Sequence, residues 1–337
     1  MIRIRSAARF ASLAAIALAG CASASDKPMT TLSPKSDLAQ WIYRLFIQVT
    51  LWDALIFAIV VVAFILALFV FSTRVGEAGP ASTAASDLTL EVAWTLGPAL
   101  VLLMISIPTV RTIFRTQGEH APEGALEIRV IAHQWWWDFQ YPDGIKTANE
   151  LHLPSGRSVR LHLESDDIIH SFWVPQLGGK RDLVPGQVNQ ITLVANTPGM
   201  YPGQCAEFCG LSHANMRFRV FVDSPADFAT WQTSQLAGPV SVPPDRQLVM
   251  DGARIFANSP CTTCHTIQGV SRGYIGPELT HFGSRSTLAA GVLANTPDNV
   301  AKWITDPNEI KPGANMPPLL LAGPKRDALV AYLESLK

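Results

Sequence analysis

Four residues that could bind a metal lie within twelve positions of one another. The segment 201–216 reads YPGQCAEFCGLSHANM and contains Cys205, Cys209, His213 and Met216. Thiolate, imidazole and thioether form a soft donor set that favours copper, and His170 could complete it from an earlier loop. The alternatives are a Cys205–Cys209 disulfide or a zinc site on two Cys and two His. Zinc has no use for Met216, so the sequence favours copper.

A second group of this kind lies toward the C-terminus. Residues 261–265 read CTTCH, and C-x-x-C-H is the attachment signature of c-type haem. The thiols of Cys261 and Cys264 would bond to the haem vinyl groups, and His265 would become an axial ligand of the iron. Met316 follows about 50 residues later on a Pro-bounded loop, GANMPP, and is the expected second axial ligand. Met/His ligation raises the haem potential, which suits an electron donor to copper.

Other interpretations of the second motif remain open. A thioredoxin-like redox pair is one alternative, although no strand–helix pattern surrounds the cysteines. His281 is an alternative sixth ligand of the iron. Met250 precedes the motif and is expected to pack in the core. Residues 276–279, GPEL, resemble the segment of small cytochromes c in which the proline packs beside the histidine ligand.

Composition limits the class of protein that can carry these motifs. The chain has 337 residues, enough for about two domains, and a formal charge of −1 from 26 basic and 27 acidic residues. Charged residues make up 16%, below the roughly 25% of soluble proteins, and 48% are hydrophobic. This composition excludes a disordered tail protein, and the absence of a long basic run argues against nucleic acid as a partner.

The N-terminus has the organisation of a secretory signal. Arg3, Arg5 and Arg9 precede the apolar run 10–19, and the sequence LAGC then ends at Cys21. LAGC resembles a bacterial lipobox, which predicts a lipoprotein-type signal peptide over 1–20 and a lipid on Cys21. The alternative is an ordinary signal peptide with a chance cysteine.

Two further segments predict a transmembrane hairpin over 41–114, after an extracytoplasmic segment at 21–40. Its helices are expected at about 45–73 and 91–112, since each contains close to the 20 apolar residues that cross a bilayer. Trp41 and Tyr43 suit the membrane interface. A secreted N-terminus followed by two spans leaves the rest of the chain outside the cytoplasm.

The extracytoplasmic part predicts two modules. Residues 120–236 alternate apolar and polar positions, as in LEIRV and VRLHL, and turn signals such as PDG and PSG separate the runs. This pattern favours a small antiparallel sandwich or barrel. Residues 237–245 form a Pro-rich linker, and 246–337 have helical patterning.

Together, these features resemble subunit II of haem-copper cytochrome c oxidases. The pattern H…C-x-E-x-C-x3-H-x2-M follows two spans, with EVAWTLGPA at 91–99 and HQWWW at 133–137. The resemblance implies a multidomain membrane protein: a two-helix transmembrane hairpin, a cupredoxin-like β-barrel with a dinuclear CuA centre, and an all-α cytochrome c domain. In that family the two coppers would be held by His170, Cys205, the carbonyl of Glu207, Cys209, His213 and Met216, with both thiolates bridging.

The same resemblance implies three further roles. Trp135 would be the exposed aromatic where electrons enter, although packing at the membrane interface is the alternative. Glu91 would lie at the mouth of a proton channel into subunit I, unless its charge only marks a helix end. The side chain of Glu207 would reach a magnesium ion at the boundary with subunit I.

The expected function is therefore electron input to a respiratory oxidase of the bacterial inner membrane. A periplasmic c-type cytochrome or similar donor would reduce the haem c, the electron would pass to CuA, and subunit I would reduce oxygen to water while protons are translocated. A tethered cytochrome would act at high effective concentration. The alternative is a freestanding membrane-anchored electron carrier with no oxidase partner.

Overall fold

The computed structural model describes residues 27–71, 87–117, 122–239, 246–319 and 321–337. The predicted signal peptide, Cys21 and most of the predicted linker lie outside these residues. The chain separates into two compact units: residues 40–118, and residues 1–39 together with 119–337.

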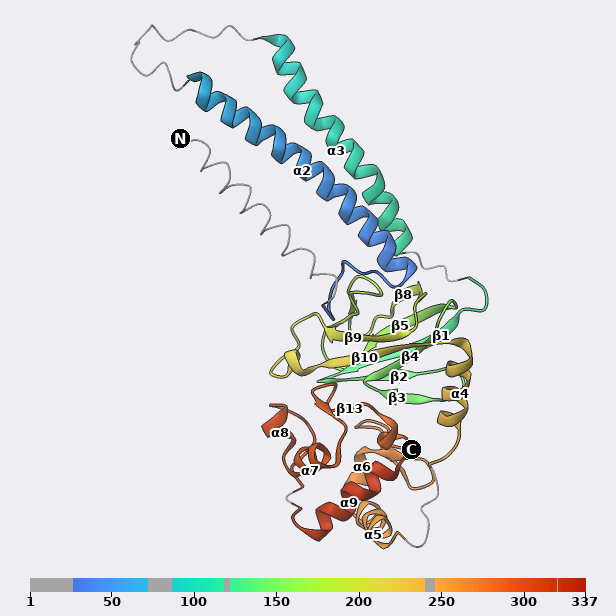
Figure 1. Ribbon diagram of the computed structural model, residues 1–337. Helices are drawn as coiled ribbons and strands as arrows, with labels where there is room; N and C mark the ends of the chain where they lie inside the picture. The colour runs from blue at the N-terminus through green and yellow to red at the C-terminus, as the bar shows by residue number, and fades with distance from the viewer. Residues whose placement is uncertain (1–26, 72–86, 118–121, 240–245, 320) are drawn as a thin grey trace, which may run out of the picture. The chain divides into compact units, whose positions relative to one another are not determined.

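The first unit is a hairpin of two apolar helices, α2 (Asp37–Phe71, whose first turn belongs to the other unit) and α3 (Leu88–Thr116) (Figure 1). At 1.5 Å per residue, their 35 and 29 residues span about 52 and 43 Å, which exceeds the roughly 30 Å of a bilayer core. Both helices are long and apolar enough to cross a membrane. The predicted pair of spans is therefore present, and both helices begin earlier than the sequence suggested.

Polar groups mark the ends of this hairpin. The Asp87 carboxylate caps α3 by accepting hydrogen bonds from the backbone N–H of Thr89 and Leu90. At the other end, the Arg115 guanidinium lies 3.9 Å from the centroid of the Trp41 ring. This cation–π contact joins the beginning of α2 to the end of α3 and fits the interfacial place predicted for Trp41.

The second unit contains a sandwich of two five-stranded sheets, ordered β3-β2-β1-β5-β8 and β4-β10-β9-β6-β7. The strands are β1 (Leu126–His133), β2 (Trp136–Gln140), β3 (Lys146–Ala148), β4 (Glu150–Pro154), β5 (Ser158–Ser165), β6 (His170–Trp173), β7 (Arg181–Leu183), β8 (Asn189–Val194), β9 (Gly199–Cys205) and β10 (Arg217–Asp223). Helix α4 (Pro225–Leu236) packs on it through Phe228 and Trp231. Residues 122–239 are called the sheet module below.

Most strand pairs are antiparallel, as the predicted antiparallel sandwich requires, but two pairs are parallel. Strands β1 and β5 pair in parallel, with Leu126 opposite Val159, and β10 pairs in parallel with β4. Parallel neighbours require a long connection rather than a hairpin turn. Here β2, β3 and β4 intervene between β1 and β5, and the chain changes sheet before it returns. Local sequence patterns cannot predict that crossover, because it depends on contacts between distant segments.

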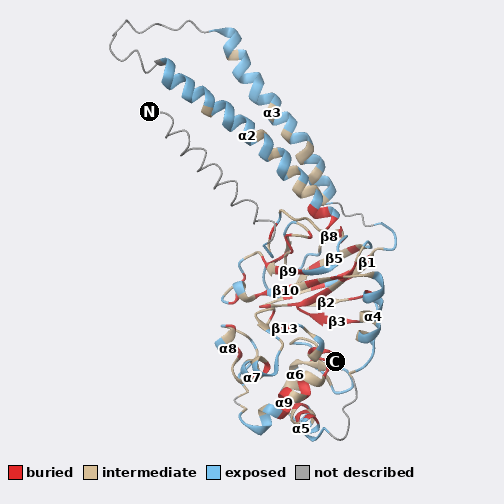
Figure 2. Cartoon of the chain, in the orientation of Figure 1, coloured by how far each residue is buried: buried red, intermediate tan, exposed pale blue. Residues whose placement is uncertain are grey.

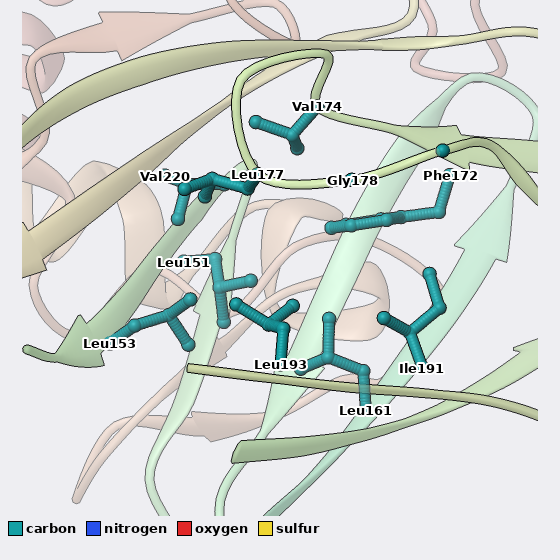
Figure 3. Close-up of a pocket in the computed structure, with 11 residues that line it drawn as sticks. Leu151, Leu153, Leu161, Phe172, Val174, Leu177, Gly178, Ile191, Leu193 and Val220 are labelled. Atoms are coloured by element: carbon teal, nitrogen blue, oxygen red, sulfur yellow. The ribbon is translucent and has the colours of Figure 1, made fainter. Parts of the chain in front are cut away.

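Alternating residues fill the space between the sheets. Strand β5, for example, buries Val159, Leu161 and Leu163, while its intervening residues remain partly exposed. Figure 2 shows the buried positions concentrated along the strands, and Figure 3 shows an interior lined by leucine, isoleucine, valine and Phe172. This interior contains no polar side chain, which identifies it as packing core and not as a binding site.

Residues 246–337, the helical module, form a second core around crossing helices. Its helices are α5 (Gln247–Ala257), α6 (Cys261–Cys264), α7 (Pro297–Thr305), α8 (Pro307–Ile310) and α9 (Pro324–Ser335), with short strands β11 (Thr266–Ile267), β12 (Ser271–Arg272), β13 (Thr287–Leu288) and β14 (Leu293–Ala294) and the 3₁₀ turn η4 (Phe282–Ser284). A Cβ added to Gly252 would lie 2.0 Å from the carbonyl oxygen of Ala328, so only glycine permits α5 and α9 to cross this closely. Met250 is 38% exposed on α5, and its predicted place in the core is wrong.

Candidate metal centre and haem-attachment site

The copper-ligand candidates meet where several strand ends converge in the sheet module. Cys205 ends β9, His170 begins β6, and backbone pairing places Cys205 opposite Phe172. The chain then makes a loop and a 3₁₀ turn, η3 (His213–Asn215), before β10. The Cys205 N–H donates to the Met216 carbonyl at 3.0 Å, which closes the loop on itself.

The donor atoms of these residues form one continuous cluster. The Cys205 and Cys209 sulfurs are 3.8 Å apart, and Cys205 Sγ lies 3.9 Å from His170 Nδ1. Cys209 Sγ lies 3.5 Å from His213 Nδ1 and 3.8 Å from Met216 Sδ. His170, Cys205 and Cys209 are buried and form a group able to hold a metal ion. The tertiary structure thus brings all five side chains together.

The cluster suits copper better than the alternatives. A sulfur–sulfur distance of 3.8 Å is far from the roughly 2.05 Å of a disulfide, and both residues are free thiols. The Met216 sulfur is fully buried against Cys209, a contact that adds a soft donor and that a zinc site on Cys and His would not use. The carbonyl oxygen of Glu207, 3.3 Å from Cys205 Sγ, supplies a further acceptor at the same point.

Hydrogen bonds around the cluster orient its members. His170 Nε2 lies 2.7 Å from Asp167 Oδ1, which leaves Nδ1 directed at Cys205. Burial lowers the pKa of His170, but its hydrogen bonds to Asp167 and Cys205 outweigh burial and hold that pKa above its ordinary value. The hydrogen bond between the two thiols lowers the pKa of Cys205 and raises that of Cys209. One thiolate is therefore favoured before any metal displaces the second proton.

Trp135 lies directly against this cluster, but it is not the exposed residue that was predicted. Only 8% of Trp135 is exposed, and its indole Nε1 donates to the Cys209 carbonyl at 2.8 Å. The ring is covered from the helical module, because a Cβ placed on Gly313 would lie 2.8 Å from Trp135 Cη2. The sequence could not reveal a cover that is formed by residues so far along the chain.

The haem-attachment residues are positioned by the helical module. Cys261 and Cys264 lie one turn apart on α6, and His265 follows immediately. His265 Nδ1 lies 2.7 Å from the Pro277 carbonyl, which leaves Nε2 for a metal. The ring also packs on Gly276, where an added Cβ would approach His265 Cε1 to 2.7 Å. The segment 276–279 therefore supports the histidine as its resemblance to cytochromes c implied, and the residues fit a covalently bound haem.

The candidates for a second axial ligand differ in their surroundings. Met316 is partly buried and packs against the core of the helical module. His281 is buried, and its Nε2 lies 3.2 Å from the Gln235 carbonyl, so that nitrogen already has a partner. This contact favours Met316 over His281.

The two remaining candidates are carboxylates with different environments. Glu91 lies in the first turn of α3, within the hairpin unit. The Glu207 side chain is 44% exposed, and its carboxylate lies 3.6 Å from Lys180 Nζ. An exposed carboxylate of this kind is accessible to a neighbouring subunit.

Sequence reasoning missed several buried or hydrogen-bonded residues around the two sites. Asp167, three positions before His170, is one that the spacing D-x-x-H could have indicated. Two more, Glu150 and Lys311, are buried charged residues with no motif around them. They make contacts across the boundary between modules, which sequence patterns do not encode.

The fold and both sites define a membrane-anchored electron-transfer protein with a copper-type and a haem-type centre. Family models agree: the transmembrane domain of cytochrome c oxidase subunit II matches residues 33–112, its periplasmic domain matches 144–222, and cytochrome c matches 249–337. The chain belongs to the cytochrome c oxidase subunit 2 family, and it is a subunit of an oxidase complex.

Relatives and solved structures show how far this similarity extends. Cytochrome c oxidase subunit 2 of Alkalihalophilus pseudofirmus is 33% identical over 99% of this chain and 98% of its own length. The subunit of a Bacillus species is 34% identical over 96% of this chain and 95% of its own length. The crystal structure of the periplasmic domain of subunit II from Bradyrhizobium japonicum is 30% identical, with 34% of this chain and 96% of that chain covered and a TM-score of 0.33.

Proposed function

We propose that this subunit accepts electrons from a periplasmic c-type cytochrome at a covalently bound haem c and passes them through Trp135 to a dinuclear CuA centre. Subunit I of the oxidase would then use them to reduce oxygen to water with proton translocation. When bound, haem c and CuA supply one-electron redox chemistry at iron and at the copper pair. The chain's own residues supply ligands, fixed geometry and a short path between the sites.

One observation carries this proposal: Trp135 joins the two sites. Its ring packs on Gly313, three residues before Met316, while its indole N–H donates to the carbonyl of Cys209. A second hydrogen bond, from Gln134 Nε2 at 2.8 Å, fixes the same carbonyl. The loop of the proposed iron ligand and a proposed copper ligand are therefore separated by a single aromatic side chain.

The ligand set assigns a role to each residue of the cluster. Cys205 and Cys209 would bridge the two coppers, and His170, His213, Met216 and the Glu207 carbonyl would complete their coordination. Because Asp167 and the strand ends hold these donors in place, the site would change shape little when its charge changes. In the second site Cys261 and Cys264 would hold the haem covalently, with His265 and Met316 as axial ligands.

Two carboxylates extend the proposal to subunit I. We assign Glu91 to the mouth of a proton channel and the Glu207 carboxylate to a magnesium ion at the subunit boundary. The chain would lie in the bacterial inner membrane with both redox modules in the periplasm. Removal of residues 1–20 and lipidation of Cys21 stay predictions that mass spectrometry of the mature N-terminus would test.

Rapid mixing of the purified oxidase with reduced donor cytochrome, without oxygen, tests the route. Haem c absorbance should change first, and the near-infrared CuA band should bleach in a second phase that Trp135→Phe slows. Reduction of CuA while haem c remains oxidised would contradict the proposal. The freestanding-carrier alternative predicts that the chain purifies without any polytopic haem protein.

A further inference from the structure

Two buried charged side chains, Glu150 and Lys311, make contacts across the boundary between the sheet module and the helical module. Glu150 belongs to the sheet module and is 6% exposed, while Lys311 belongs to the helical module and is 4% exposed. Neither belongs to the proposed ligand sets. Burying a charge costs free energy unless hydrogen-bonding partners compensate it. The partners of Glu150 and Lys311 therefore indicate the structural role of these two charges.

Glu150 binds a single turn of the helical module. Its Oε1 accepts hydrogen bonds from the Ser286 N–H at 2.8 Å, the Ser286 hydroxyl at 2.5 Å and the Thr287 N–H at 3.1 Å. Arg219, also in the sheet module, donates to the Ser286 hydroxyl at 2.9 Å. One carboxylate oxygen thus receives two consecutive backbone N–H groups from the other module, a charge-assisted arrangement.

Lys311 makes the reciprocal contact. Its ammonium donates to the carbonyl oxygen of Trp135, in the sheet module, and lies 3.5 Å from the Ala289 carbonyl. Burial lowers the pKa of this lysine to about 7. The amine therefore lies in a poorly hydrated position against the backbone of Trp135, the residue that joins the two redox sites.

Two further hydrogen bonds join the modules at the same boundary. The Ser212 hydroxyl donates to the Pro312 carbonyl at 2.6 Å, and the Arg217 N–H donates to the Ala290 carbonyl at 3.1 Å. Elsewhere a groove lies between the modules, lined by residues such as His133 and Lys146 on one side and Arg272 on the other. The modules consequently meet through a limited set of polar contacts, among which Glu150 and Lys311 supply the buried charges.

We propose that Glu150 and Lys311 are positioning residues that lock the helical module onto the sheet module, with the loop of Met316 seated on Trp135. This docking also closes Trp135 to external donor proteins, so that electrons must first enter the haem. The inference rests on the proposed function, and it adds the residues that enforce the order of transfer.

The closure follows from the exposure of Trp135. A soluble protein donates electrons efficiently through a contact surface that it can reach, and here Gly313 of the helical module packs against the indole, which is only 8% exposed. If the module were released, the same ring would become accessible. Release should therefore have two effects: slower transfer from haem to copper, and a new direct reaction between donor and CuA.

Flash-induced electron transfer from haem c to CuA in the full oxidase tests the proposal. Glu150→Ala and Lys311→Met should each slow this step about tenfold or more, the shift expected when a buried hydrogen-bonding partner is lost at about 1.4 kcal/mol per factor of ten. Glu150→Gln keeps the accepting oxygen, and Lys311→Arg keeps the charge, so both should largely restore the rate. Glu123→Ala and Lys302→Met remove exposed charges from the same two modules and should leave it unchanged.

Two further readouts separate docking from general damage. Hydrogen exchange at the Ser286 and Thr287 amides should accelerate in Glu150→Ala, while the haem c and CuA spectra keep full intensity. A direct reaction between donor and CuA, with a rate proportional to donor concentration, should appear only in Glu150→Ala and Lys311→Met, called the locking variants. If either locking variant fails to assemble, the other variant and its conservative partner still decide the question.

The outcomes distinguish the inference from the function on which it rests. Sequential reduction of haem and copper in the wild type, with unchanged rates and exchange in both locking variants, would overturn only the locking role. Direct reduction of wild-type CuA by the donor, ahead of haem c, would overturn the closure and the proposed route together.

Discussion

The copper-ligand cluster and the haem-attachment segment are held by different kinds of structure. Among the copper-ligand candidates, His170 and Cys205 lie at the paired ends of β6 and β9, and the others lie on the loop that follows; Cys205, Cys209 and Met216 are at most 1% exposed. The haem-attachment cysteines lie on a four-residue helix, and both are partly exposed. Strand pairing and a loop closed by the Cys205–Met216 hydrogen bond therefore hold the first site, whereas the second depends on the crossing of α5 and α9 at Gly252.

The two sites are therefore sensitive to different kinds of mutation. In the sheet module, Cys205, Cys209 and Met216 belong to the hydrophobic core. Replacing a ligand there should therefore abolish metal binding while the surrounding fold remains. The helical module has a smaller core, so loss of packing should reach its metal site more readily.

Replacing either bridging thiol should have the largest effect. Cys205→Ser or Cys209→Ser should abolish the near-infrared CuA band, because a hard hydroxyl oxygen cannot replace a thiolate that bridges copper. The haem c spectrum should remain, since its cysteines lie in the other module. A retained band with two bound coppers would show that the ligand assignment is wrong.

Gly252→Ala should damage the helical module selectively. The new Cβ would meet the Ala328 carbonyl at 2.0 Å, and because that neighbour is backbone, α5 and α9 must move apart. We expect a loss of about 1–3 kcal/mol or more in the unfolding free energy of this module, with weaker haem retention. The CuA band should be unaffected. Gly238→Ala, whose nearest neighbour would be 3.7 Å away, is the matched control.

Met316→Leu should change a potential without changing the fold. Loss of the thioether ligand should lower the haem c potential and slow oxygen consumption, while the copper spectrum stays constant. Redox titration of the purified complex measures this shift. Met250→Leu is the control: at 38% exposure it should alter stability by less than about 1.5 kcal/mol and leave the potential unchanged.

The smallest predicted effect is a pH dependence from Lys311. Because burial lowers its pKa to about 7 from the ordinary 10.5, the unfolded chain binds more protons at this site between these pH values. Stability should therefore rise with pH across that window, by about 1 kcal/mol between pH 7 and pH 8, and the gain should be absent below pH 7. Unfolding of the wild type and Lys311→Met at several pH values isolates this contribution. Equal slopes in both proteins would contradict the lowered pKa.

The sequence alone determined the chemistry of both sites and the order of the modules along the chain. Donor types and short spacings are local, so C-x-x-C-H and the 205–216 motif identify the haem and copper candidates without any fold. The two spans follow from apolar length, which the membrane requires whatever lies beside it. The alternation of apolar and polar residues in LEIRV and VRLHL is also local, and it predicted two strands that the structure shows as β1 and β5.

Only the tertiary structure decided what surrounds those donors. The parallel pairing of β1 with β5, the burial of Trp135 and the exposure of Met250 depend on which distant segments meet. Glu150 and Ser286 are 136 residues apart, and Lys311 and Trp135 are 176 apart. A contact over such separations is set by how whole modules pack, and neither periodicity nor spacing within a segment records it.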